Sequence, residues 1–251
     1  MLSLDFLQPK EAEINLAASK SECNRALMLS HLSGNRVSVK RLSTADDSIR
    51  LKYLLENFED AALVDCGPAG TTFRFLTALA AFTPGKRILT GSERMLQRPI
   101  GDLVDTLCSL GADIRYMGKE GYPPLGIKGV SKPQATEASI SMEKSSQFAS
   151  ALLLVASSWR QDFTLHITEP KGSIPYLDLT IKQIQDAGIH CFREDKTVFI
   201  KSSEYLELEL WPESDWSAAS YWYTLVALSK VPVKLLGLKE NSAQGDSALV
   251  D

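Results

Sequence analysis

The sequence has 251 residues, of which 44% are hydrophobic and 23% are charged. This composition is ordinary for a globular protein, and no apolar run is long enough to span a bilayer. The net charge of −4 at pH 7 argues against a general nucleic-acid or membrane-surface binder, because such proteins usually carry an excess of basic residues. A small anionic ligand is compatible with this charge, since a few converging Arg and Lys side chains can hold it.

Short β-branched runs alternate with amphipathic stretches along the chain, which predicts an α/β protein. In chain order, the predicted strands are 12–16, 36–40, 62–65, 86–90, 113–116, 125–129, 139–141, 163–168, 190–193, 197–201, 206–210 and 231–236. The predicted helices are 21–33, 46–58, 71–81, 99–110, 146–159, 175–187 and 217–229.

Small, polar or glycine-bearing clusters precede almost every predicted helix. Ser, Thr and Asp there satisfy the free amide groups of a first helical turn, and capping alone accounts for Asp46 and Asp47. Cations accompany several starts as well: Lys20 and Arg25 flank the first one, and Arg98 lies just before the fourth. Helix N-termini attract anions, and nearby Arg or Lys strengthens such a site. The pattern favours an anion-binding pocket, provided that these helix starts converge.

The cysteine and histidine spacings bear on metals and on the redox compartment. The four cysteines are widely separated without a C-x-x-C pair, which favours free thiols in a reducing cytoplasm. None of the three histidines lies at metal-ligand spacing from a cysteine or another histidine. The N-terminus also lacks a basic segment followed by an apolar one. We therefore predict a cytoplasmic protein without a metal site.

Residues 19–27, S-K-S-E-C-N-R-A-L, resemble the S-K-S-x-S-N-R-A-L motif of the enolpyruvylshikimate-phosphate synthases. Residues 67–74, G-P-A-G-T-T-F-R, are similar to the G-N-A-G-T-x-x-R motif of the same family. Further matches follow in the family's order, at residues 46–48, 89–91, 94–100, 121–125, 145–148, 175–176, 215–221 and 241–246. Because the matches are collinear, the resemblance extends over the whole chain.

The resemblance implies the enolpyruvyl transferase fold, an inside-out α/β barrel. Two similar domains, each built from three βαβαββ units, close over the substrates. Residues 18–214 would form one complete domain, which binds shikimate 3-phosphate, and residues 1–17 and 215–251 would belong to an incomplete second domain. Family members are longer, and their catalytic aspartate would follow Asp251. We therefore expect a C-terminally incomplete chain that cannot turn over alone.

The implied activity transfers the enolpyruvyl group of phosphoenolpyruvate to the 5-hydroxyl of shikimate 3-phosphate and releases phosphate. This is a step of the shikimate pathway of aromatic amino acid biosynthesis. The reaction needs a positioned acid and base and several cations that hold a carboxylate and two phosphates. It needs no metal or other cofactor. The resemblance implies no nucleic-acid or membrane partner, and we expect a monomer.

The resemblance also assigns roles to individual residues. Lys20 would be catalytic and would contact both substrates. The residues implied for shikimate 3-phosphate are Lys20, Ser21, Arg25, Ser145, Ser146, Gln147, Ser173 and Tyr176. Those implied for phosphoenolpyruvate are Lys20, Gly70, Thr71, Arg98 and Gln147. Taken alone, Ser145 and Ser146 would be interpreted as a helix cap; in register with the other motifs, we interpret them as ligands.

Some positions depart from the family pattern. Pro68 replaces an Asn, which removes a side-chain amide and a backbone N–H beside the expected phosphoenolpyruvate site. Ala18 replaces a Gly, and Ile174 replaces a frequent basic residue.

The UDP-N-acetylglucosamine enolpyruvyl transferases share the fold, but they carry Asn after the active lysine, where this chain has Ser21. A non-catalytic module that binds shikimate 3-phosphate or another small anion stays open as an alternative.

Overall fold

A computed structural model describes residues 11–169 and 174–250. The strands are β1 (Ala12–Asn15), β2 (Val37–Val39), β3 (Leu63–Asp65), β4 (Gly85–Thr90), β5 (Asp113–Tyr116), β6 (Leu125–Gly129), β7 (Glu137–Ser141), β8 (Phe163–Thr168), β9 (Cys191–Glu194), β10 (Thr197–Ile200), β11 (Leu208–Leu210) and β12 (Val233–Leu236). The helices are α1 (Lys20–Leu32), α2 (Asp46–Glu56), α3 (Gly70–Ala81), α4 (Glu93–Leu96), α5 (Gly101–Ser109), α6 (Ser146–Ala156), α7 (Ile174–Asp186), α8 (Trp216–Ser229) and the 3₁₀ helix η1 (Gly245–Val250). Every predicted element is present, and α4 and η1 are additional.

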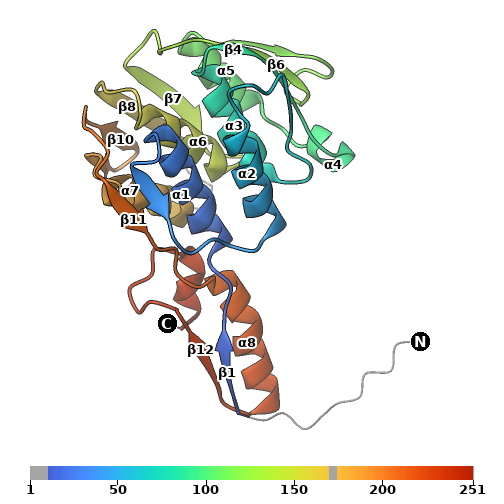
Figure 1. The fold of residues 1–251 in the computed structure, drawn as a ribbon, viewed down its shortest axis with the longest axis vertical. Helices are drawn as coiled ribbons and strands as arrows, with labels where there is room; N and C mark the ends of the chain where they lie inside the picture. The colour runs from blue at the N-terminus through green and yellow to red at the C-terminus, as the bar shows by residue number, and fades with distance from the viewer. Residues whose placement is uncertain (1–10, 170–173, 251) are drawn as a thin grey trace.

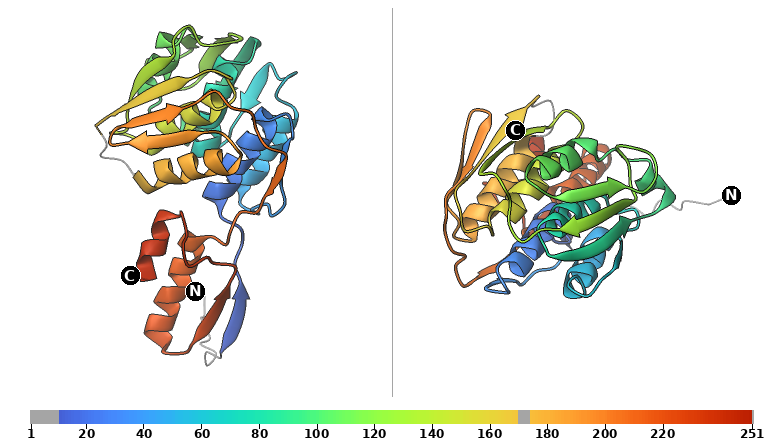
Figure 2. Two further views of the ribbon diagram at one scale, coloured as in Figure 1. Left: turned by 90° about the vertical axis from the view of Figure 1, so that its left-hand side faces the viewer. Right: turned by 90° about the horizontal axis from the view of Figure 1, so that it is seen from above.

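Two four-stranded sheets of the larger body repeat the same topology. One has the order β3-β4-β6-β5 and the other β7-β8-β10-β9. In each sheet the first two strands are parallel and the remaining pairings are antiparallel. Each sheet is therefore built from one βαβαββ unit, as the resemblance implied. The sheets lie on the outside of the body (Figure 2).

The expected third unit differs from the other two, because its sheet contains only two strands. Strand β2 pairs in parallel with β11, which comes from the far end of the same body. Helices α1 and α2 flank β2 in the sequence. The chain leaves this body for the smaller one soon after β11, so the described residues supply no further strand to this sheet (Figure 1).

Helices α1, α3 and α6 pack against one another in the centre of the larger body (Figure 1). Along α6, every residue except Gln147 is buried, and α3 is buried except at Thr71. A helix that is apolar on all sides requires such burial, whereas α2 buries only Ser48, Leu51 and Leu55 on one face. The barrel is thus inside out, with helices in the core and sheets around them.

The smaller body consists of the parallel strands β1 and β12, helix α8 and η1. Two segments, residues 17–19 and 213–215, run side by side and connect it to the larger body. We call this pair of segments the crossing. Ala18 and Ser214 form an isolated antiparallel bridge there. The Ser19 N–H donates to the Glu213 carbonyl (2.8 Å), and the Asp215 N–H donates to the Ala17 carbonyl (3.0 Å). In the described part of the chain, no helix has the length and apolar character needed to span a membrane.

Candidate active site

A cavity of about 640 Å³ lies where the larger body meets the crossing, and we call it the main cavity. Most of the predicted substrate-binding residues line it, namely Lys20, Ser21, Arg25, Thr71, Ser145, Ser146, Gln147 and Tyr176. They come from four helices that lie far apart in the sequence. Ser173 lies outside the described residues, and the structure does not place it.

The first turns of the three central helices meet at the main cavity. Lys20 and Ser21 begin α1, Thr71 is the second residue of α3, and Ser146 is the first residue of α6. Free backbone N–H groups and the positive ends of three helix dipoles therefore point toward one space. The predicted anion-binding pocket required that these helix starts converge, and in the structure they do.

Ser145 combines the two roles between which the sequence alone could not decide. It is the N-cap of α6, and its Oγ accepts a hydrogen bond from the Gln147 N–H (3.2 Å). Ser145 also lines the main cavity. Because a hydroxyl has one hydrogen to donate and two lone pairs, the cap leaves its O–H available to an anion. Capping and ligand binding are therefore compatible at this residue.

Arg25 is held rigidly at the wall of the main cavity and is only 2% exposed. Its Nε donates to Thr180 Oγ1 (2.7 Å) and its Nη1 to the Ser21 carbonyl (2.9 Å). Its Nη2 donates to the Tyr176 carbonyl (3.1 Å) and to Ser150 Oγ (3.3 Å). These bonds occupy four of the five guanidinium N–H groups and leave one on Nη1.

The charge of Arg25 is not balanced by a neighbouring carboxylate within ion-pair distance among the described residues. Burial lowers the pKa of this guanidinium to about 10, so it is still protonated at neutral pH. A buried cation whose donors face neutral oxygens leaves the site with uncompensated positive charge. An anionic ligand in the main cavity would supply the missing charge.

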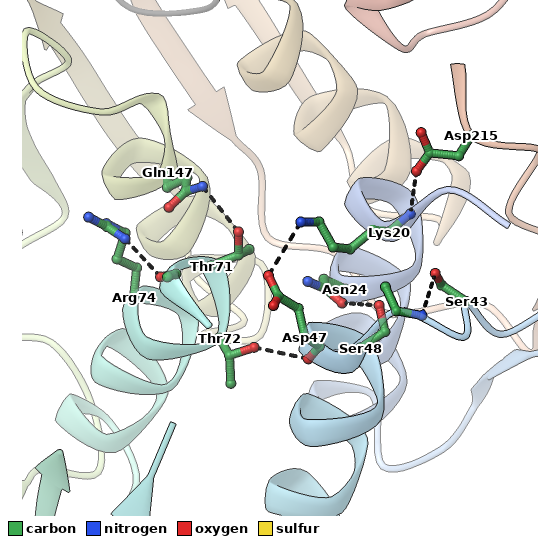
Figure 3. A network of polar contacts seen from close by, with 12 residues as sticks. Lys20, Asn24, Ser43, Asp47, Ser48, Thr71, Thr72, Arg74, Gln147 and Asp215 are labelled. Carbon is green, nitrogen blue, oxygen red and sulfur yellow. Dashed lines mark hydrogen bonds and ion pairs between the residues drawn. The ribbon is translucent and has the colours of Figure 1, made fainter. Parts of the chain in front are cut away.

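Lys20 extends from α1 toward the first turns of α2 and α3 (Figure 3). Its Nζ lies 3.4 Å from Asp47 Oδ2, and its backbone N–H donates to Asp215 Oδ2 (3.1 Å). The interpretation of Asp46 and Asp47 as caps is wrong. Ala45 is the N-cap of α2 and makes no side-chain cap, while the carboxylate of Asp47 points outward to Lys20.

Gly70, Arg74 and Arg98 form a second cationic cluster at the first turn of α3. A Cβ built on Gly70 would lie 2.0 Å from Arg98 Nη1 and 2.7 Å from Arg74 Nη1, so only glycine admits both guanidinium groups. Arg74 Nη1 donates to the Gly70 carbonyl (2.9 Å), and its buried Nε has no partner in the described chain. Burial, and next the charge of Arg98, lower the pKa of Arg74 to about 10.

Gln147 links the two groups of predicted residues. Its Nε2 donates to Thr71 Oγ1 (3.1 Å), which ties the first turn of α6 to that of α3 (Figure 3). Its Oε1 is buried and has no partner in the described part of the chain. Gly70 precedes Thr71 and Arg98 lies against Gly70, but neither Gly70 nor Arg98 lines the main cavity. They form a cationic cluster beside the cavity.

Several residues without a predicted role also line the main cavity. These are Ala45, Lys144, Asp215, Ser217, Ala218 and Tyr221. The stretch 215–221 was noted as a family motif, which was the available signal for four of them. Lys144 pairs with Asp102 (2.9 Å) at the rim. Asp215 belongs to the crossing, and it caps α8 by accepting a hydrogen bond from the Ala218 N–H (3.0 Å).

The fold defines the class of protein first. Structures of EPSP synthase from Acinetobacter baumannii match this one with TM-scores of 0.76 and 0.75 at 17% and 19% sequence identity. The first match covers 92% of this chain and 57% of that one. The predicted enolpyruvyl transferase fold is therefore confirmed.

The sequence comparisons then define the family. The profile of EPSP synthase (3-phosphoshikimate 1-carboxyvinyltransferase) matches residues 50–251, and the chain belongs to this family. It is 41% identical over 240 residues to a 3-phosphoshikimate 1-carboxyvinyltransferase of Bacteroides fragilis, covering 94% of this chain and 58% of that protein. A Neisseria meningitidis enzyme of the same name is 35% identical over 264 residues, which is 95% of this chain and 61% of that protein. The chain thus spans about three fifths of the length of these relatives.

Proposed function

We propose that the main cavity binds shikimate 3-phosphate. We also propose that the chain contributes this site to an enzyme that transfers the enolpyruvyl group of phosphoenolpyruvate to the 5-hydroxyl. The observation that carries the proposal is the convergence of three helix N-termini with Lys20 and the buried Arg25 around one cavity. Membership of the EPSP synthase family supports the same substrate.

The geometry suggests how the ligand would be held. The phosphate would lie at the N-terminus of α6, where Ser145 and Ser146 offer hydroxyl groups beside free backbone N–H groups. The remaining Nη1 N–H of Arg25 would donate to the ring substituents. Gln147 and Tyr176 would bound the ring on two sides.

Phosphoenolpyruvate would lie beside this ligand, against Thr71 and the cationic cluster of Gly70, Arg74 and Arg98. In the proposed reaction the 5-oxygen adds to C2 and loses its proton, while the methylene C3 gains one. Loss of that C3 proton together with phosphate then restores the double bond. Lys20 would act at these carbons, because its ammonium lies between the first turns of α1 and α3 (Figure 3).

The proposed domain division follows the crossing. We assign residues 18–214 to the domain that binds shikimate 3-phosphate, and residues 1–17 and 215–251 to part of a second domain. The side-by-side passage of residues 17–19 and 213–215 supports boundaries at these positions. A monomer in the cytoplasm stays a prediction, which size-exclusion chromatography and cell fractionation test.

The decisive experiment is a calorimetric titration of this chain with shikimate 3-phosphate, with shikimate as the comparison. We expect saturable binding that requires the phosphate. Ser146→Ala should weaken it, whereas Ser158→Ala, beyond the opposite end of α6, should not. Equal binding of shikimate, or no binding by the folded chain, would contradict the proposal. Addition of phosphoenolpyruvate and measurement of released phosphate then separate a transferase from a non-catalytic binding module.

A further inference from the structure

A second polar cavity lies on the other side of the first turn of α1. We call it the crossing cavity; its volume is about 410 Å³, and it shares no lining residue with the main cavity. Helix α7, strand β11, the Glu213 segment and the loop after β12 surround it. While Lys20 and Ser21 line the main cavity, the next residue, Glu22, lines this one.

Two buried carboxylates meet at this cavity without a cationic partner. Glu22 is 7% exposed and Glu213 is 3% exposed, and neither forms an ion pair in the described chain. Both oxygens of Glu213 are occupied: Oε1 accepts from Ser242 Oγ and Gln244 Nε2 (2.7 Å), and Oε2 accepts from the Lys239 N–H (3.0 Å). These are neutral donors, so the negative charge of Glu213 is solvated but not balanced.

Glu22 is less completely satisfied. Its Oε2 accepts the Glu213 N–H (2.8 Å), and Oε1 has no hydrogen-bond partner among the described residues. Burial is the main cause of its raised pKa, and the charge of Glu213 also raises it. The carboxylate at this position is therefore costly in the absence of a cation.

Gln183 provides an independent sign of a missing donor. This residue of α7 lines the same cavity and is 7% exposed, and its Oε1 is buried without a partner. Of the other charged residues of the wall, only Lys239 forms no ion pair within the described chain. Lys182 pairs with Asp186, and Glu209 pairs with Lys40 (2.9 Å). Two acceptor oxygens of the wall thus lack hydrogen-bond donors, and among the described residues Lys239 is the single unpaired cation against the two carboxylates Glu22 and Glu213.

We propose that the crossing cavity binds a small primary ammonium ion with a short apolar substituent, whose N–H groups donate to Glu22 Oε1 and Gln183 Oε1. An ammonium group carries only donors and one positive charge, which match the two deficits. Leu179, Leu208 and Pro212 give apolar walls for the substituent. A metal ion fits less well, because the described residues include no group of three or more His, Cys, Asp and Glu side chains placed to hold one. The ligand would contact the segment that leads into the crossing at Ser214.

Calorimetry with butylammonium chloride tests the proposal, and butyltrimethylammonium, which has the charge but no N–H, is the comparison. We expect saturable binding of butylammonium alone. Glu22→Gln and Gln183→Leu should each weaken it at least about tenfold, the effect of a lost charge-assisted hydrogen bond. The matched control is Glu209→Gln, which alters a paired carboxylate of the same wall and should change the affinity less than about twofold.

Three results would overturn the proposal. These are equal binding of both cations, undiminished binding by folded Glu22→Gln and Gln183→Leu variants, and no saturation well above about 1 mM. Lys239 also lines the cavity, and its charge lowers the pKa of Glu22. If butylammonium binds only to a Lys239→Ala variant, then the Lys239 ammonium itself is the occupant and the proposal is wrong.

Discussion

Replacement of Gly70 by alanine tests whether the cationic cluster beside α3 holds phosphoenolpyruvate. The added Cβ would lie 2.0 Å from Arg98 Nη1 and 2.7 Å from Arg74 Nη1. Ordinary contacts begin at ~3.5 Å, so the Arg98 guanidinium must move by roughly 1.5 Å. A displacement of that size should weaken the affinity for phosphoenolpyruvate about tenfold to a hundredfold, or about 1.4–2.7 kcal/mol.

The same substitution should scarcely affect folding. The clashing atoms are the ends of side chains that can move, and alanine is favoured over glycine in a helix by up to about 1 kcal/mol. Gly101→Ala is the matched control, because Gly101 is likewise the first residue of its helix. A Cβ there would find its nearest neighbours at ordinary contact distances, 3.6 Å (Gly121 Cα) and 3.8 Å (Tyr116 Oη).

The assay is calorimetric titration with phosphoenolpyruvate in the presence of saturating shikimate 3-phosphate, together with urea unfolding of each variant. We expect Gly70→Ala to lose affinity while it unfolds at a urea concentration close to that of the parent. Gly101→Ala should match the parent in affinity. The reasoning fails if Gly70→Ala binds within about twofold of the parent, or if both variants lose affinity equally.

Three other substitutions test the site and its electrostatics. Arg25→Lys keeps the charge but offers only three donors to four acceptors. Urea unfolding should therefore show a loss of about 1–3 kcal/mol in the free energy of unfolding, and calorimetry should show a weaker affinity for shikimate 3-phosphate. Parent-like values in both measurements would contradict the role of the guanidinium fork. Lys20→Ala removes a half-exposed ion pair with Asp47, so the free energy of unfolding should change by less than about 1 kcal/mol. The affinity for shikimate 3-phosphate should nevertheless fall. An unchanged affinity would mean that Lys20 is not part of the site. The pKa of Glu22 is raised above its ordinary value of 4.5, so the folded state binds the proton of this carboxyl group more tightly than the unfolded state does. The protonated group therefore stabilises the fold below pH 4.5. This stabilisation is lost as the pH rises through the pKa of the folded state. Glu22→Gln should therefore be more stable than the parent to urea at pH 7 but not at pH 4, and an equal difference at both pH values would refute this.

Most of the fold could be predicted from local patterns, and the errors have physical causes. The predicted helix 99–110 begins at Gly101, because Ile100 is its N-cap and has a non-helical φ of −136°. Helix α4 has four residues and is too short to show a helical period. The third βαβαββ unit, expected from the family, has only two strands in its sheet. Strand pairing is not a local property, so periodicity does not report it.

The sequence by itself determined the chemistry of the helix starts. Hydroxyl groups, glycines and cations at residues 19–25, 67–74 and 144–147 indicated an anion site, because each feature acts through the first turn of its own helix. The matching motifs also identified the family and, residue by residue, most of the wall of the main cavity. Both kinds of information lie in short stretches of chain.

Only the tertiary structure decided which of these groups meet. Arg25 takes its acceptors from Ser150 and Thr180, which lie 125 and 155 residues away, and so becomes a fixed, unbalanced cation. Glu22 appeared in the sequence only as the variable position of a motif, yet its carboxylate reaches Glu213 across 191 residues and faces a different cavity from Lys20. The physical reason is that burial and charge balance depend on neighbours in space. The packing of α1, α3 and α6 and the passage of the chain through the crossing create those neighbours, and no sequence period records them.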